Sequence, residues 1–249
     1  QSGLTCAFYF DTLQSYKKEK LVEGGIPFIL GTTEVFLPFL GVALSAQARE
    51  LPKKKSECSM LTQKFLLIVI YQNIRSASAA QMADLLGVSR MSGTRCMDEI
   101  EVLFPTLIQK NGRRRVFAWD SGWKAYWTLI RPSLRNPVVR EYRLDEPLNL
   151  SLPLSGISAV CHYSMLDDGH TCVYGMTKKM AADRKLSTQP QVPSDEIPTA
   201  IVQELGYELP FQNYLAVDPL TAILSLTPED QEDPRVEGAI QEIEENYLP

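Results

Sequence analysis

The sequence predicts an α+β protein, in which helices and small sheets are combined in more than one domain. Its 249 residues suit about two domains of ordinary size. A hydrophobic content of 45% and a charged content of 22% are those of a globular chain, which argues against a disordered or fibrous protein. Short apolar runs with the spacing of strands also alternate with longer segments that have helical spacing.

The formal net charge of −5 is the balance of three unlike blocks. Residues 1–52 have a net charge of −1, residues 53–143 one of +9, and residues 144–249 one of −13. We expect three corresponding parts: a small α/β element at 1–52, a central domain at 56–143, and an acidic, mixed α+β regulatory or interaction domain at 144–249. The basic block predicts a module that faces a polyanion.

Three further features restrict the class of protein. The longest strongly apolar run, Phe65–Tyr71, is far shorter than the roughly 18 residues of a membrane span. The N-terminus lacks the pattern of a signal peptide. The five cysteines are odd in number and form no CxxC pair, which argues against a disulfide framework or a zinc ribbon. We therefore expect a cytoplasmic protein with reduced thiols and no membrane association.

The first block predicts a strand, a helix and two strands, at Leu4–Phe10, Asp11–Glu23, Ile26–Leu30 and Val35–Leu44. Asp11 is the expected cap of the helix, Gly24-Gly25 its stop, and Gly31-Thr32-Thr33 the turn between the last two strands. Pro38 places part of the last strand at an edge or a bulge. About 50 residues are too few to bury a hydrophobic core large enough for an independently stable domain. Because the chain begins with Gln1, we also consider this block the end of a truncated domain.

Residues 46–59 are polar and predict a linker that contains the run Lys53-Lys54-Lys55. This run is either a solvated hinge or a contact with a phosphate backbone.

The second block predicts three helices, at Leu61–Ile74, from Ser78 to Leu86, and from Ser89 towards Phe104. Ser78 and Gln81 have the spacing of a capping box. Gly87 is placed where a left-handed residue ends a helix. Ser89 is the expected cap of the third helix.

A hairpin and a fourth helix follow. The strands Thr106–Lys110 and Arg113–Trp119 are joined by Asn111-Gly112, the strongest two-residue hairpin signal. Asp120 or Ser121 caps the helix, which runs through Ile130. Residues 131–144 are expected to run extended into the next part. Two short helices joined by a tight turn, then a hairpin, have the order and lengths of a winged helix-turn-helix.

This domain carries the candidate DNA-binding residues. Hydroxyls and arginines at the start of the third helix can bind phosphate and read guanine edges, and an arginine-rich hairpin can lie along a phosphate backbone. The winged-helix fold also serves as a protein-docking module, and the hairpin is then only a solvated turn. The candidates are Ser89, Arg90, Met91, Ser92, Thr94 and Arg95 on the helix, and Lys110, Asn111, Arg113, Arg114 and Arg115 on the hairpin.

The inward face of the third helix is predicted from helical spacing. Met97, Ile100 and Leu103 or Phe104 are expected to face the core. Gly93 stands where a buried aliphatic residue is usual in such a helix. We expect it to cost roughly 1 kcal/mol relative to alanine and to leave a packing gap.

The third block predicts a mixed set of elements. Ser155, Asp218 and Asp233 are expected helix caps, the last two followed by proline in the first turn. The final helix has an apolar stripe at Val236, Ile240, Ile243 and Tyr247. The expected elements are helices at Ser155–Leu166, Asp218–Leu226 and from Asp233 onward, strands at Thr171–Met176, Ala200–Leu209 and Asn213–Val217, and a loop at Gln189–Pro198.

No catalytic constellation is expected, and neither a cofactor nor a metal site. No phosphate-binding loop and no dinucleotide fingerprint is present in the sequence. His162, Asp167, Asp168 and His170 are residue types that can ligate a metal, but a helix exit and turn explain them better. The aromatic set Trp119, Trp123, Tyr126 and Trp127 is either the core beneath the hairpin or a ligand cage.

Two resemblances rest on short segments that are spread over most of the chain. Gln81–Glu101 (QMADLLGVSRMSGTRCMDEIE) resembles the recognition unit of MarR-type winged-helix regulators of bacteria, and Gly25–Gly41 is similar to a segment that precedes this unit in one subgroup. Leu154–Leu166 and Val217–Leu226 resemble the same subgroup and, distantly, antitoxins of the AbiE type. The resemblances imply a dimeric, DNA-binding repressor. AbiE-type antitoxins also oppose a nucleotidyltransferase toxin.

The sequence thus predicts a sequence-specific transcriptional regulator that binds double-stranded DNA as a homodimer and is not an enzyme. The alternative is an antitoxin-like module whose acidic C-terminal domain binds a partner protein. Two apolar surfaces are candidates for the dimer contact. They are Phe28, Phe36, Phe39 and Leu40 in the first block, and the stripe on the last helix.

Overall fold

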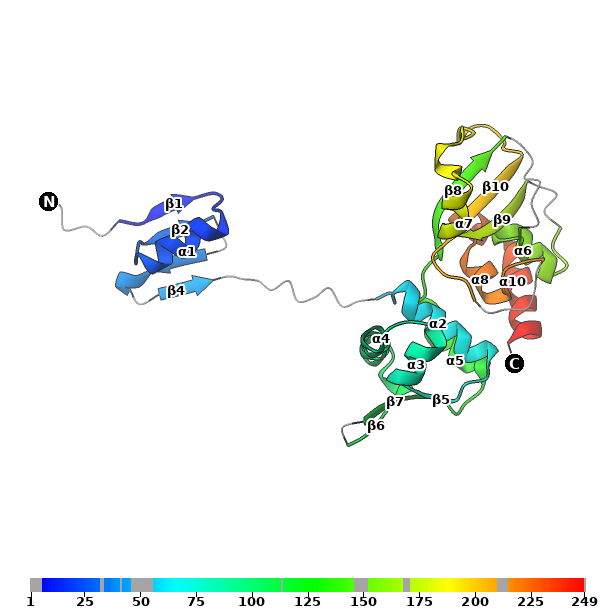
Figure 1. Cartoon of the computed structure of the whole chain (residues 1–249), viewed down its shortest axis with the longest axis horizontal. Helices are drawn as coiled ribbons and strands as arrows, with labels where there is room; N and C mark the ends of the chain where they lie inside the picture. The colour runs from blue at the N-terminus through cyan, green and yellow to red at the C-terminus, as the bar shows by residue number, and fades with distance from the viewer. Residues whose placement is uncertain are drawn as a thin grey trace. The chain divides into compact units, whose positions relative to one another are not determined.

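The computed structural model describes residues 6–31, 34–40, 42–45, 56–112, 114–145, 152–167, 171–209 and 215–248. These residues form helices and three small sheets, so the fold belongs to the α+β class that the sequence predicts (Figure 1). The chain divides into two compact units, residues 1–55 and 56–249. The lysine run at 53–55 lies outside the described residues.

The N-terminal unit is a four-stranded sheet with one helix. The strand order is β1-β2-β3-β4, in which β1 is parallel to β2 and the remaining pairs are antiparallel. An ion pair of 2.9 Å between Lys18 Nζ and Glu34 Oε1 places the helix on the face of the sheet that carries Glu34. The elements are β1 (Phe8–Phe10), α1 (Ser15–Glu23), β2 (Phe28–Leu30), β3 (Glu34–Leu37) and β4 (Val42–Ser45).

Two local predictions for this unit are wrong. Helix α1 begins after Gln14 rather than at Asp11, and no side chain caps it. Pro38 begins a 3-10 turn, so the single strand expected at 35–44 is the hairpin of β3 and β4. Proline has no amide hydrogen for the ladder, which favours this interruption. The helix does stop at Gly24, as expected, and Gly25 has a left-handed φ of 61°. Thr32 and Thr33 of the expected turn lie outside the described residues.

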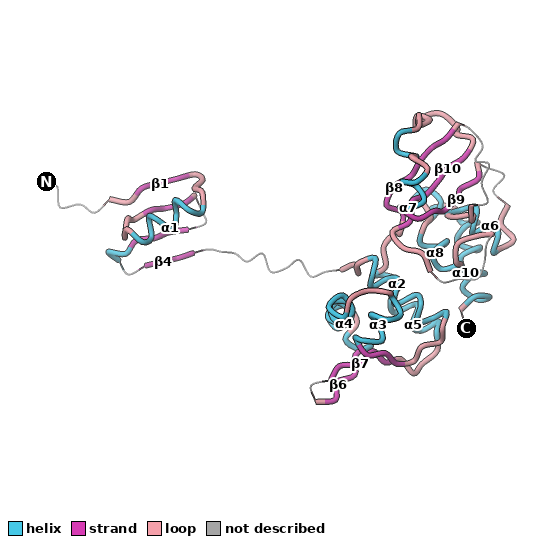
Figure 2. The backbone as a smooth tube through the Cα atoms, in the orientation of Figure 1, coloured by secondary structure: helices cyan, strands magenta, loops and turns pink. Residues whose placement is uncertain are grey.

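The second unit begins with a winged helix-turn-helix arrangement. Helix α2 (Met60–Tyr71) is buried over most of its circumference and forms the centre of the core. The sheet has the order β5-β7-β6, and its short strand β5 is an element that the sequence did not predict. The other elements are β5 (Ser76–Ser78), α3 (Ala79–Leu86), α4 (Arg90–Leu103), β6 (Ile108–Asn111), β7 (Arg114–Ala118) and α5 (Trp123–Ile130). Figure 1 labels β5, and Figure 2 shows the three helices with the β6–β7 hairpin.

The caps of this domain follow the sequence closely. Ser78 and Gln81 form the expected capping box, Gly87 ends α3 with a φ of 66°, and the Ser89 hydroxyl accepts a hydrogen bond from the Ser92 amide. The cap predicted for α5 is wrong. That helix begins after Gly122, and no side chain caps it.

The remainder of the unit is a three-stranded sheet with helices on both faces. Strand β10 (Ala200–Leu205) lies between β8 (Val138–Leu144), which is antiparallel to it, and β9 (Cys172–Thr177), which is parallel. Helix α7 (Lys178–Asp183) covers the face that carries Tyr142 and Val202. The other helices are α6 (Gly156–Tyr163), α8 (Pro219–Leu224), α9 (Pro228–Glu232) and α10 (Pro234–Tyr247).

The two parts expected at 56–143 and 144–249 are packed together around one hydrophobic cluster. Polar contacts also join them: Gln63 Nε2 donates to the Tyr207 hydroxyl at 3.0 Å, and the Tyr71 hydroxyl donates to Asp218 Oδ1 at 2.7 Å. Strand β8 belongs to the C-terminal sheet. The charge boundary in the sequence therefore does not mark a gap in packing.

The caps predicted for the third block have mixed outcomes. Asp218 accepts a hydrogen bond from the Thr221 amide, and Asp233 one from the Arg235 amide, as expected of caps. Ser155 precedes α6 without capping it, because its hydroxyl donates to Gln203 Oε1 at 2.8 Å. The apolar stripe of α10 is buried at Val236, Ala239, Ile240 and Ile243, so this helix closes its own unit.

Candidate nucleic-acid interface

Helices α3 and α4 cross very closely at Gly93. A Cβ atom at this position would lie 2.9 Å from Ala83 Cβ and nearer still to the carbonyl oxygen of Ala79. The expected packing gap is therefore wrong: the glycine is the point of closest approach, and a larger residue would push the helices apart. Met97, Ile100 and Phe104 face the core, as predicted.

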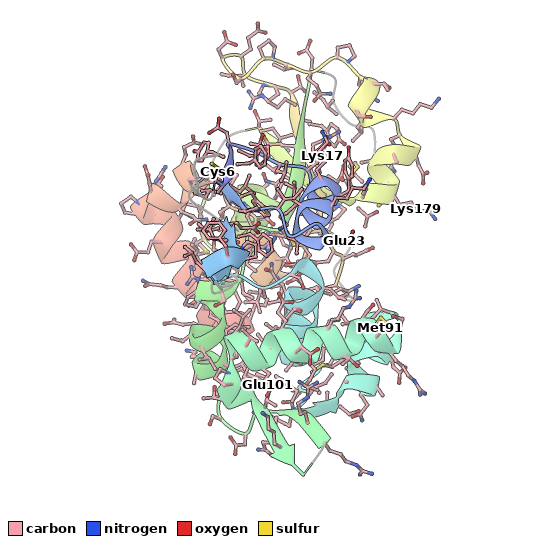
Figure 3. The ribbon with its side chains drawn as sticks, turned by 90° about the vertical axis from the view of Figure 1, so that its left-hand side faces the viewer. Cys6, Lys17, Glu23, Met91, Glu101 and Lys179 are labelled. Atoms are coloured by element: carbon pink, nitrogen blue, oxygen red, sulfur yellow. The ribbon has the colours of Figure 1, made fainter. Side chains whose placement is uncertain are left out.

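The outward face of α4 carries the helical candidates. Arg90, Thr94 and Arg95 are exposed, Met91 is 66% exposed, and Ser92 is half-buried. Figure 3 shows this helix with Met91 near one end, Glu101 near the other, and the β6–β7 hairpin beneath it. The structure thus brings the predicted helical residues onto one accessible surface.

The hydroxyl groups of this surface are already used within the helix. Ser89 and Ser92 share a hydrogen bond of 3.0 Å between their hydroxyls, and the Thr94 hydroxyl donates to the carbonyl of Arg90 at 3.0 Å. Their first role is to complete the start of α4. The side chains that remain to contact a partner here are therefore mainly the two arginines and Met91.

The hairpin turn lies one residue later than predicted. Lys110 pairs with Arg115 and Asn111 pairs with Arg114, so Asn111 belongs to the strand and the loop begins at Gly112. Gly112 has a φ of 60°, a conformation suited to glycine in such a loop. Arg113 and the side chain of Asn111 lie outside the described residues.

Two cations of the hairpin are held by carboxylates of α4. The Arg115 guanidinium forms ion pairs of 2.6 Å with Asp98 and 2.5 Å with Glu101, and Lys110 also pairs with Glu101. Hydrogen bonds from Lys110 and Arg115 lower the pKa of Glu101. These contacts hold the hairpin against the helix and neutralise part of its positive charge.

Asp98 and Glu101 are functional candidates that the sequence reasoning missed as partners of the hairpin. The sequence pattern that could have indicated this pairing is two acidic residues three positions apart on a helix that precedes a basic hairpin. Among the described side chains, Arg90, Arg95 and Arg114 take part in no ion pair or hydrogen bond. Among the described residues of α4 and the hairpin, the cations without a carboxylate partner are therefore two on α4 and one on β7.

The aromatic set belongs to the core. Trp123, Tyr126 and Trp127 are each no more than 2% exposed, and the rings of Trp123 and Tyr126 meet edge to face at 5.4 Å. The Arg75 guanidinium lies 4.3 Å from the centre of the Trp123 ring and donates to the carbonyl of Ser121. The ligand cage considered from the sequence is not formed by these three rings.

Two other findings concern the described part of the chain. It contains no group of three or more histidine, cysteine or acidic side chains arranged to hold a metal, although Asp168 and His170 lie outside it. None of its helices has the length and apolarity needed to cross a membrane. Comparison with family models, curated proteins and solved structures finds no match to this chain.

Proposed function

We propose that this chain is a sequence-specific transcriptional regulator that binds double-stranded DNA in the cytoplasm. The observation that carries the proposal is the exposed face of α4, where Arg90 and Arg95 have no partner among the described residues. The arrangement of α3, α4 and the hairpin is suited to placing such a helix in a major groove. The resemblance of Gln81–Glu101 to MarR-type regulators points to the same activity, and to repression as its outcome.

The proposed contacts divide by chemistry. The guanidinium groups of Arg90 and Arg95 read guanine edges, because arginine can donate two hydrogen bonds to one guanine. Arg114 lies along the phosphate backbone, where it contributes affinity without sequence preference. Asp98 and Glu101 position the hairpin by holding Arg115 and Lys110.

Fluorescence anisotropy with duplexes from the DNA upstream of the gene tests this assignment. Arg95→Ala is expected to weaken binding about 5- to 150-fold, the range for loss of a base contact of about 1–3 kcal/mol. Arg114→Ala should weaken binding to all sequences alike and reduce the salt dependence. Lys179→Ala, which removes an exposed charge on α7, is the matched control and should leave the affinity unchanged. Failure of the wild-type chain to bind at micromolar concentration, at low and high salt, would refute the proposal.

We further propose that the regulator is a homodimer, because operators for such domains are commonly two half-sites about one helical turn apart. The N-terminal sheet offers an apolar face opposite α1, formed by the paired residues Tyr9, Ile29 and Val35. Tyr9 is 63% exposed. Of the contact residues predicted from the sequence, Phe39 and Leu40 are also exposed, but Phe28 is buried and the prediction for it is wrong. Light scattering is expected to give twice the 28.0 kDa of one chain, and a single-chain mass at every concentration would contradict the dimer.

One observation favours the alternative, an antitoxin-like module that binds a partner protein. The ion pairs of Arg115 and Lys110 leave the hairpin less basic than its sequence suggests. The partner would then contact the acidic residues of 144–249, whose net charge is −13. Purification of the full chain from its native host distinguishes the two. Two results together favour the antitoxin-like module. The wild-type chain does not bind DNA, and a stoichiometric partner protein stays bound to the Arg90→Ala, Arg95→Ala double variant.

A further inference from the structure

A cavity of about 350 Å³ lies at the carboxyl ends of the parallel strands β9 and β10. This volume falls within the range of small-molecule sites. Its walls are mainly apolar side chains from both strands, from α7 and from the segment before α8. They include Met176, Met180, Leu205, Leu209 and Val217.

The polar residues that line the cavity are acidic or carry hydroxyl groups. Asp218, Thr221, Thr177 and Glu208 are among them, and none of the described lining residues is basic. Glu208 is exposed, whereas Asp218 is only 4% exposed. This composition disfavours an anionic ligand and favours one that donates hydrogen bonds or carries positive charge.

Asp218 is a buried carboxylate without a counter-ion in the described part of the chain. Its carboxyl accepts hydrogen bonds from the Tyr71 hydroxyl and the Thr221 amide, but none of the ion pairs involves it. Burial raises the pKa of Asp218, and the hydrogen bonds from Thr221 and Tyr71 only partly oppose this. A buried charge is costly unless a cation accompanies it, and the cavity beside Asp218 has room for one.

We propose that this cavity binds a small organic ammonium, with its apolar body among the methionine and leucine side chains and its N–H groups donating to Asp218. A metal ion would leave the apolar walls unused, and a purely apolar molecule would leave the carboxylate without a cation. The site is independent of the DNA-binding surface, so either proposal can fail without the other.

Methionine-methyl NMR on the full chain tests the site directly, with 2-phenylethylamine as the probe. Met176 and Met180 line the cavity, whereas Met91 and Met165 are 66% and 89% exposed elsewhere and act as internal controls. Each signal is assigned with a Met→Leu variant. The amine is expected to shift the two cavity signals saturably and to leave the controls unchanged. Phenylacetate, the anionic analogue, should shift none of them, and 2-phenylethanol should bind about tenfold more weakly than the amine.

Two variants complete the test. Asp218→Asn keeps a side chain that can cap α8 and should weaken binding of the amine about tenfold, to the level of the alcohol. Met180→Trp fills the cavity and should abolish the response of Met176. The proposal is overturned if no probe shifts the cavity signals, if phenylacetate binds as well as the amine, or if Asp218→Asn leaves the amine affinity unchanged. Should Asp218→Asn not fold, the comparison of amine with phenylacetate on the wild-type chain decides.

Discussion

Replacing Gly93 with alanine should force α3 and α4 apart. The added Cβ would lie 2.9 Å from Ala83 Cβ and 3.1 Å from the Ala83 amide nitrogen, and closer still to the Ala79 carbonyl oxygen. Two of these three atoms belong to the backbone and the third is a Cβ, so no rotation of a side chain can relieve the overlap. One of the helices must therefore move.

The expected cost follows from two opposing terms. Overpacking against atoms that cannot rotate away should reach the upper part of its usual range, about 3 kcal/mol. Alanine is favoured over glycine within a helix by about 1 kcal/mol, which offsets part of this cost. The net loss of about 2 kcal/mol corresponds to a fall in melting temperature of roughly 4–8 °C for a unit of this size.

Gly238→Ala is the matched control for thermal unfolding followed by circular dichroism. Gly238 lies within α10, and a Cβ there would meet no atom within 4 Å. This variant should gain about 0.5–1 kcal/mol from helix propensity alone and melt slightly higher than the wild type. A Gly93→Ala variant as stable as the wild type would refute the close crossing of the two helices.

Three further predictions concern the hairpin, the buried thiols and a helix cap. The pKa of Glu101 is lowered by two hairpin cations, so the stabilisation is present above the unfolded pKa and is lost as the pH falls through the lowered folded value. The protection of the β6 and β7 amides against hydrogen exchange, relative to an unfolded chain at the same pH, should therefore fall only in acid. Glu101→Gln should lower this protection already at neutral pH. Burial raises the pKa of Cys58 to about 12 and of Cys96 to about 11. At mildly alkaline pH both thiols should therefore react with a disulfide reagent only when the chain unfolds, after the exposed Cys172 has reacted. Prompt reaction of every thiol would contradict the burial of Cys58 and Cys96. Ser78→Ala removes the capping box and should cost about 1 kcal/mol, measured as a melting temperature roughly 2–4 °C lower; an unchanged value would mean that the box contributes nothing.

The features that the sequence predicted well are local ones. The cap at Ser78, the left-handed stop at Gly87 and the cap at Ser89 each depend on neighbours within three or four positions. Gly93 was misread because its role depends on the helix that crosses it, which spacing along one helix does not reveal. Ser155 was misread for a similar reason, since its hydroxyl donates to a glutamine on a distant strand.

The candidate interface was predicted only in part, because some of its features depend on contacts between elements that are distant in the sequence. Exposure of Arg90 and Arg95 follows from helical periodicity, whereas the ion pairs of Arg115 require the hairpin to fold back onto α4. The cavity beside Asp218 was not predicted at all. Its walls come from segments far apart in the sequence, and Asp218 was recognised only as a helix cap.

Selection from a random pool of DNA duplexes tests the central claim most directly. The full chain is incubated with the pool at moderate salt, and the bound duplexes are sequenced over several rounds beside an Arg90→Ala, Arg95→Ala double variant. We predict that the wild type enriches one motif, which the double variant no longer selects although it still folds. Enrichment of no motif by the wild type, or of the same motif by both proteins, would contradict the account of α4 as the helix that reads DNA.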